Sequence, residues 1–236
     1  ETSAQVVATA ATEGFIAVSP DGVPGDFGIR TWNGGTCCGY AAAHDVDDVG
    51  FVAALLDHLE ARLCIDRRRV YAMGMSNGAI LSYRLACELS SRIRAVGPVS
   101  GTIMVDPCTP GRPVPMRHVH GTDDANLPFA GGLGCGAAGV AFTPVPDAIA
   151  GAAGRNGCTG SPVVALQEGD GTCVRQGDCP AGSEVELCTI AGGGHQWPGG
   201  EPPVVAGLPG CPFGYQSQSF DATTELWSFF STHPPR

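Results

Sequence analysis

The sequence predicts an α/β fold, with a mostly parallel β-sheet flanked by helices. Short apolar, β-branched runs alternate along the chain with stretches whose apolar residues recur at helical spacing. Hydrophobic residues make up 43% of the 236 residues and charged residues only 15%, which is enough to bury a sizeable core. Because neither an internal repeat nor a linker interrupts the pattern, we expect residues 1–236 to form a single catalytic domain.

The first expected elements lie before residue 64. A helix over 4–13 leads into a buried strand over 14–19, which ends at the turn residues 20–22, Pro-Asp-Gly. A glycine-rich loop follows. Asp45 or Asp47 then caps a helix whose apolar side chains recur at helical spacing, namely Val49, Val52, Leu55, Leu56, Leu59 and Leu63.

The rest of the chain continues the alternation of strands and helices. The expected elements are, in order, a buried strand over 69–74, a helix over 77–90, strands over 95–99 and 114–120, a strand over 184–190 and a helix over 221–230. A Gly- and Cys-rich insertion runs from about 130 to 183. We expect this insertion to be mostly structureless, with one helix near 146–153.

Composition excludes several classes of function. The net charge is −10, and all 13 basic residues are arginine. Without lysine the chain has no group for Schiff-base chemistry and no lysine for a phosphate-binding loop. An acidic protein lacks the basic face that nucleic acids need, and the longest apolar runs, such as 51–56, are too short to cross a bilayer.

Eleven cysteines indicate a disulfide framework and hence an oxidising compartment, either extracellular or periplasmic. No Cys-x-x-Cys pair occurs in the sequence, so the cysteine spacing does not indicate a metal site. The odd count leaves at least one thiol free or bonded to another chain. Cys87 and Cys188 lie within apolar helix and strand patterns, so either is a candidate for a buried free thiol. The sequence begins at Glu1 rather than at methionine, so we expect processing or truncation upstream.

The sharpest motif is Gly-Met-Ser-Asn-Gly over 74–78, between a predicted strand and a predicted helix. A serine on such a tight turn needs small neighbours, because the backbone there is strained and closely packed. The turn presents the Ser76 hydroxyl as a nucleophile. It also directs the backbone N–H of Asn77, at a helix N-terminus, toward a developing oxyanion.

A serine nucleophile requires a base, and His195 is the best placed of the six histidines. It lies in a glycine loop directly after a predicted strand, where ligands meet parallel sheets. The three histidines expected on the surface are His44, His58 and His233.

The supporting acid should follow another strand, between the serine and the histidine. Asp123 and Asp124 both qualify by spacing, and the residues alone do not choose between them. An alternative interpretation is a metal site, because His118 and His120 alternate onto one strand face. The competing expectation is that His118 is a buried, hydrogen-bonded strand residue and that no metal or other cofactor is needed.

These motifs identify a resemblance. The chain resembles the secreted polyhydroxybutyrate depolymerase and feruloyl esterase family of α/β-hydrolases. The resemblance rests on residues 14–22, the Trp32–Gly39 stretch with its Cys-Cys pair, and residues 47–51, 69–79, 120–124 and 192–199.

The resemblance implies that the acid is Asp124 rather than Asp123, and that Trp197 lines the substrate cleft, although core packing would also explain this tryptophan. Members of the family carry a strand and a His-Gly loop before the position of residue 1, and that loop supplies a second oxyanion donor. We therefore expect the chain as given to lack the first strands of the fold and to retain only the Asn77 amide as a donor.

Together these features predict a serine esterase with Ser76, His195 and Asp124 as its triad, acting through an acyl-enzyme. The expected substrate is an extracellular polyester, such as a polyhydroxyalkanoate, or a feruloylated plant polysaccharide. The alternatives are a peptidase or thioesterase on the same fold, or a truncated binding module without turnover. The sequence leaves open the natural ester, the oligomeric state and whether the insertion covers the cleft.

Overall fold

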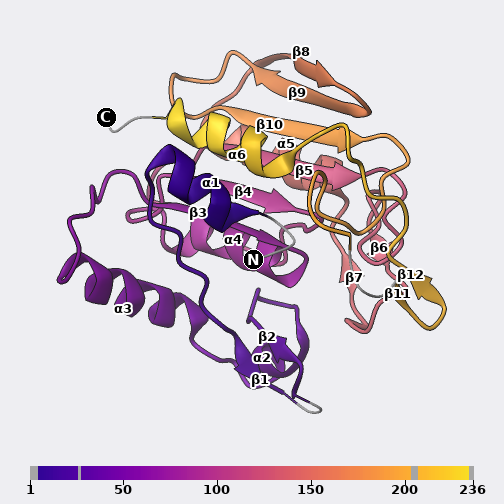
Figure 1. Cartoon of the computed structure of the whole chain (residues 1–236), viewed down its shortest axis with the longest axis horizontal. Coiled ribbons are helices and arrows are strands. Elements are labelled where there is room, and N and C mark those ends of the chain that lie inside the picture. The colour runs from indigo at the N-terminus through magenta and orange to yellow at the C-terminus, as the bar shows by residue number, and fades with distance from the viewer. Residues whose placement is uncertain (1–4, 26–27, 203–206, 234–236) are drawn as a thin grey trace.

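A six-stranded mixed β-sheet organises the chain, as the computed structural model shows for residues 5–25, 28–202 and 207–233 (Figure 1). The strand order is β3-β4-β5-β10-β9-β8. The bounds are β3 Tyr71–Met75, β4 Ala95–Val99, β5 Met116–Gly121, β8 Gly160–Glu168, β9 Gly171–Gly177 and β10 Val185–Ile190. The structure thus shows the expected α/β architecture.

The first four strands of this order are parallel to one another. β4 and β5 are buried along their whole length, which explains why their sequences read as continuous apolar runs rather than as alternating ones. Because these strands are parallel, their carboxyl ends meet at one edge of the sheet. The loops after β3, β5 and β10 therefore lie together there.

Helices cover both faces of the sheet (Figure 1). On one face α6 (Ala222–Ser231) packs against β4, β5 and β10 through Leu226, Phe229 and Phe230, with α1 (Val6–Glu13) beside it. On the other face lie α4 (Asn77–Glu88) and α5 (Val145–Asn156), with α3 (Asp48–Glu60) outside α4. No described helix is long and apolar enough to cross a membrane.

The remaining elements are short. They are β1 Val23–Pro24, β2 Arg30–Thr31, α2 Gly39–Ala43, β6 Gly132–Leu133, β7 Ala141–Phe142, β11 Gly207–Leu208 and β12 Cys211–Pro212. The cap predicted for the 47–60 helix is Asp47, whose Oδ1 accepts from Gly50 N at 2.8 Å. The first predicted helix begins at Val6; Ala4 lies outside the described residues.

The strand predicted over 14–19 is wrong. This segment is extended but pairs with no described strand. Ile16 is 55% and Val18 45% exposed, whereas Phe15 stacks on Trp227 of α6 with ring centroids 4.3 Å apart. An apolar β-branched run makes a strand only where a neighbour supplies hydrogen-bond partners, and β3 ends the described sheet on this side without pairing to it.

The expectation of a mostly structureless insertion over 130–183 is also wrong. The helix is present as α5, but β8 and β9 form a long antiparallel hairpin that pairs with β10. β8 is exposed on both faces over most of its length, so it lacks the apolar alternation that marks a half-buried strand. The hairpin makes the sheet mixed.

Five disulfides staple the described chain. They join Cys37 to Cys38, Cys87 to Cys108, Cys135 to Cys211, Cys158 to Cys179, and Cys173 to Cys188. The unpaired thiol is the exposed Cys64, and not Cys87 or Cys188 as predicted. Burial in an apolar pattern did not distinguish a free thiol from a bonded one, because a buried disulfide packs as an apolar group as well.

Candidate active site

Ser76 occupies the turn between β3 and α4 and has φ 56° and ψ −120°. A positive φ is unusual for a residue with a side chain and marks backbone strain of the kind found at functional sites. A Cβ on Gly74 would lie 2.7 Å from the backbone of Gly78, so residue 74 must be glycine. A Cβ on Gly78 would meet nothing within 4 Å, so only one of the two glycines is needed for space.

The next residue, Asn77, links this turn to the glycine-rich loop. Its side-chain Oδ1 accepts from Trp32 N at 2.6 Å, and its Nδ2 donates to Trp32 O at 2.9 Å. The backbone N–H of Asn77 stands at the N-terminus of α4, where a helix leaves its first N–H groups without internal acceptors. The side chain therefore fixes the loop beside the turn, and the backbone N–H remains available to a ligand.

His195 and Asp124 form a buried pair on the loops after β10 and β5. His195 Nδ1 lies 2.8 Å from Asp124 Oδ2, and the two residues are 9% and 4% exposed. The other carboxylate oxygen, Oδ1, accepts from the backbone N–H groups of Asn126 at 2.9 Å and Leu127 at 2.8 Å. Asp123 is exposed and does not face the imidazole; its Oδ1 accepts from Thr122.

Glycines allow the two loops to pack backbone against backbone. A Cβ on Gly121 would lie 2.2 Å from Gly193 O, and a Cβ on Gly193 would lie 3.0 Å from Gly121 Cα. Thr122 N donates to Ile190 O at 3.0 Å, and Asp123 N donates to Gly193 O at 2.9 Å. The glycine run before His195 therefore serves this close approach, which brings the histidine to the aspartate.

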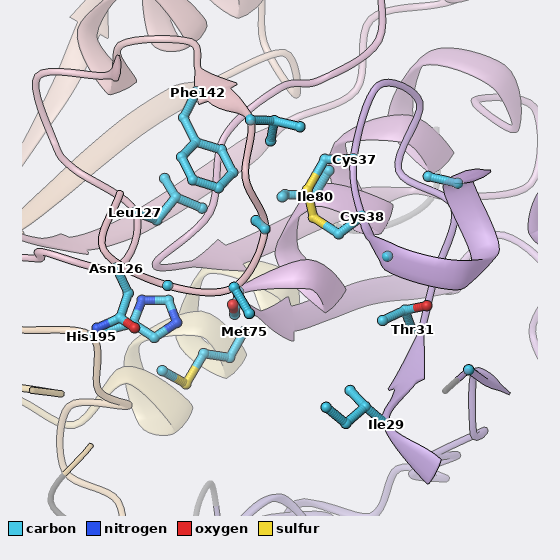
Figure 2. Close-up of a pocket in the computed structure, with 18 of the residues that line it drawn as sticks. Ile29, Thr31, Cys37, Cys38, Met75, Ile80, Asn126, Leu127, Phe142 and His195 are labelled. Carbon is cyan, nitrogen blue, oxygen red and sulfur yellow. A yellow bond between two sulfur atoms is a disulfide. The ribbon is translucent and has the colours of Figure 1, made fainter. Parts of the chain in front are cut away.

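A cavity of about 1140 Å³ opens over the turn and is lined by both Ser76 and His195. Figure 2 shows His195 and Asn126 together, with the Cys37–Cys38 disulfide and Ile80 across the cavity from them. Buried apolar groups line part of the wall, namely Cys37, Ile80, Leu127 and Phe142. Among the described residues no hydrogen bond joins Ser76 to His195, although both face this one space.

The sequence of this chain was compared with those of known proteins. No family model matches the chain. Feruloyl esterase B of Piromyces equi is 34% identical over 203 residues, which cover 83% of this chain and 36% of that protein. A probable feruloyl esterase C of Aspergillus niger is 30% identical over 186 residues, 78% of this chain and 57% of that protein. The chain is similar to feruloyl esterases.

A bifunctional acetylxylan esterase/xylanase of Neocallimastix patriciarum is also similar, with 32% identity over 118 residues, 50% of this chain and 16% of that protein. The chain thus spans between about a third and three fifths of the length of its feruloyl esterase relatives. These names support the carbohydrate-esterase part of the resemblance. None of the three supports the polyhydroxybutyrate depolymerase part.

Trp197, which the family resemblance placed in the substrate cleft, is mainly a core residue. It is 5% exposed, packs in the cluster beneath α6, and donates from Nε1 to Thr223 Oγ1 at 3.0 Å. It also contributes to the cavity lining. Both expectations for this tryptophan therefore describe part of its surroundings.

One of the three histidines that were expected on the surface is buried. His44 and His58 are exposed, but His233 is buried and contacts Glu184 Oε2 at 2.8 Å and Phe229 O at 2.6 Å, so its prediction as a surface residue is wrong. His118 and His120 are fully buried and hydrogen-bonded to each other. Among the described residues, no three His, Cys, Asp or Glu side chains converge on a point that would suit a metal ion.

Several groups at the candidate active site were not predicted from the sequence. The Asn77 side chain, the Asn126 and Leu127 amides, and the apolar wall formed by Ile80 and Phe142 were not identified. A polar residue directly after the serine was the one available signal for the first of these. The others depend on how distant segments fold together.

Proposed function

We propose that the chain is a serine esterase of the α/β-hydrolase type that hydrolyses carboxylic esters on plant polysaccharides. The observation that carries the proposal is the 2.8 Å contact between His195 and Asp124 beside a cavity that the strained Ser76 also lines. Similarity to feruloyl and acetylxylan esterases favours ester substrates. In this proposal residues 1–236 act as one catalytic domain in a secreted protein.

The proposed reaction begins with the Ser76 hydroxyl. Asp124 accepts the Nδ1–H of His195, which leaves Nε2 unprotonated and able to take a proton from Ser76 Oγ. The oxygen attacks the ester carbonyl, and the carbonyl π electrons move to the carbonyl oxygen. When the tetrahedral intermediate collapses, the alcohol leaves with the proton that His195 returns. Water then attacks the acyl-enzyme by the same route and releases the acid and the free serine.

The charge that develops on the carbonyl oxygen needs a donor in place beforehand. The Asn77 N–H is the proposed donor, because it lies at the amino end of α4 directly after the nucleophile. Its position is set by the strained turn and by the side-chain contacts to Trp32. A fixed dipole of this kind requires no reorganisation during the reaction.

The cavity wall favours an apolar acyl group. Ile80, Leu127 and Phe142 present hydrocarbon to the space beside the serine, and the Cys37–Cys38 pair lies with them. A feruloyl ring would bury apolar area there, at about 25 cal/mol per Å² removed from water. Trp197 is proposed to contact the substrate through the edge that reaches the cavity.

Hydrolysis of methyl ferulate tests the proposal, with p-nitrophenyl acetate, a short hydroxybutyrate oligomer and a peptide anilide as competing substrates. We expect turnover of the aromatic ester and its loss by a factor of roughly 10⁴ or more in Ser76→Ala. Ser228→Ala, an exposed serine on α6, is the matched control and should retain full activity. An unchanged rate in Ser76→Ala would overturn the serine mechanism, and preference for the oligomer or the anilide would overturn the substrate class.

A further inference from the structure

A chain of buried hydrogen bonds extends from the candidate site into the core. Tyr83 Oη lies 2.9 Å from His118 Nδ1, and His118 Nε2 lies 2.9 Å from His120 Nδ1. His120 Nε2 contacts Leu127 O at 2.9 Å and lies 3.5 Å from Asp124 Oδ2. The three side chains are at most 1% exposed, so no water competes for these groups.

The direction of every hydrogen bond follows from the last acceptor. A carbonyl oxygen only accepts, so His120 Nε2 must carry a proton and donate to Leu127 O. In a neutral ring His120 Nδ1 then accepts from His118 Nε2–H. By the same reasoning His118 Nδ1 accepts from the Tyr83 hydroxyl. One arrangement of protons therefore satisfies every nitrogen, with both imidazoles neutral and protonated at Nε2.

Burial supports this neutral state. Desolvation lowers the pKa of His118 well below its usual value, and it lowers the pKa of His120 despite the nearby Asp124 carboxylate. Desolvation also raises the pKa of Tyr83, so that its hydroxyl keeps the proton that it donates. The titratable and charged groups near the chain are Asp124 and His195 at one end and Arg155 at the other.

The chain ends on the loop that holds the carboxylate. Leu127 accepts a hydrogen bond from His120 through its carbonyl oxygen and donates one to Asp124 Oδ1 through its backbone N–H. One residue therefore connects the histidine to the carboxylate. The His120 Nε2–H also lies near Asp124 Oδ2, the oxygen that accepts from His195. Packing holds the His120 ring, since it lies parallel to His118 at 5.2 Å and edge-on to Phe129 at 5.9 Å.

We propose that His120, held through His118 by Tyr83, is a positioning residue that orients the Asp124 carboxylate and thereby the His195 ring. Tyr83 belongs to α4, the helix that begins after the nucleophile, and both histidines belong to β5, which ends before the acid. The chain therefore ties the element carrying the serine to the loop carrying the aspartate. This inference rests on the proposed esterase mechanism.

Kinetics of three variants test the chain. His120→Leu should lower kcat by about ten- to a hundredfold with KM within twofold, because a misplaced catalytic group costs up to about 10² in rate. The acid limb of the kcat/KM profile should also move to lower pH, because the imidazolium loses an oriented counter-charge. His120→Gln, which retains an N–H donor near the Nε2 position, should recover most of kcat, and Tyr83→Phe should lose about three- to tenfold.

The matched control is His233→Leu. It removes another buried histidine that contacts a backbone carbonyl and a carboxylate, but one that lies just after the C-terminal end of α6 and does not line the cavity. It should destabilise the fold yet leave kcat and the pH profile within twofold. If folded His120→Leu behaved in the same way as this control, the positioning role would be overturned.

Nitrogen-15 NMR of the imidazoles in the wild-type protein provides a second test that needs no variant and no turnover. Both His118 and His120 should be neutral Nε2–H tautomers whose signals stay constant between pH 5.5 and 9. A ring that titrates in this range, or that carries its proton on Nδ1, would overturn the inference even if His120→Leu failed to fold. Failure of the esterase mechanism itself is read separately, from Ser76→Ala.

Discussion

His195 Nδ1 lies 2.8 Å from Oδ2 of Asp124, whereas Asp123, one residue earlier, points to solvent. Both oxygens of the buried carboxylate are occupied, since two backbone N–H groups of its own loop donate to Oδ1. The carboxylate is thus held in one orientation against the ring.

Substitution of the two neighbouring aspartates should separate their roles. Asp124→Asn presents a neutral amide to the ring and favours the wrong tautomer, so we expect kcat to fall by roughly 10³ to 10⁴. Asp123→Asn removes an exposed charge and should change kcat by less than about threefold. Steady-state hydrolysis of methyl ferulate by both variants provides the measurement. Equal losses in the two would contradict the assignment of Asp124.

The two glycines around Ser76 should respond differently to alanine. Gly74→Ala places a methyl group 2.7 Å from the backbone of Gly78, so the turn must shift, and we expect a loss of about 2–4 kcal/mol of stability together with most of the activity. Gly78→Ala meets open space in the first turn of α4 and should fold at least as well as the wild type. Urea unfolding of both variants tests this asymmetry, and equal destabilisation would refute it.

The buried histidines should make stability depend on pH. Desolvation lowers the pKa of His118 and His120 in the folded state, whereas in the unfolded chain an imidazole binds a proton as the pH falls through about 6.5. The unfolded state then binds more protons, so each ring lowers the free energy of unfolding by about 1.4 kcal/mol per pH unit below that point. Above about pH 7.5 the rings are neutral in both states, and their contribution is constant.

Urea unfolding between pH 7.5 and 5.5 measures this slope. His118→Gln and His120→Gln should each reduce the number of protons taken up on unfolding by about one, which makes the slope shallower. The exposed His58→Gln should not change the slope. A slope that is the same in all three variants and the wild type would show that neither buried ring titrates on unfolding.

The disulfide between Cys173 and Cys188 should contribute strongly to stability. It joins β9 to β10 across 15 residues, and both cysteines are fully buried. Closing a loop of that length restricts the unfolded chain by about 3 kcal/mol. The double alanine variant should lose about 2–5 kcal/mol in denaturant unfolding, while Cys64→Ala should lose less than about 0.5. Alkylation of the unreduced native protein should modify Cys64 alone among the described cysteines, and modification at Cys173 would contradict the pairing.

Local sequence patterns were sufficient to predict part of the structure. The turn at Ser76 could be predicted because a strand, a glycine-flanked serine and a helix follow one another within a few residues. The sheet order, in contrast, depends on partners. The 14–19 segment has the composition of a buried strand but no described neighbour to pair with, and the exposed β8 pairs despite lacking a strand-like pattern.

The same distinction applies within the site. Residue spacing left Asp123 and Asp124 equivalent, because the difference lies in which carboxylate the Asn126 and Leu127 amides surround. The identity of the free cysteine was equally inaccessible, since it depends on which sulfur atoms meet in the fold. Cys64 lies just beyond α3, where no other described cysteine bonds to it.

The most direct test of the central claim is labelling with a fluorophosphonate probe, followed by mapping of the modified peptide. If Ser76 is an activated nucleophile, the wild-type protein takes up one probe per molecule at Ser76, and His195→Ala abolishes the labelling while the fold is retained. A folded wild-type protein that takes up no probe, or that is labelled at another serine, would contradict the account.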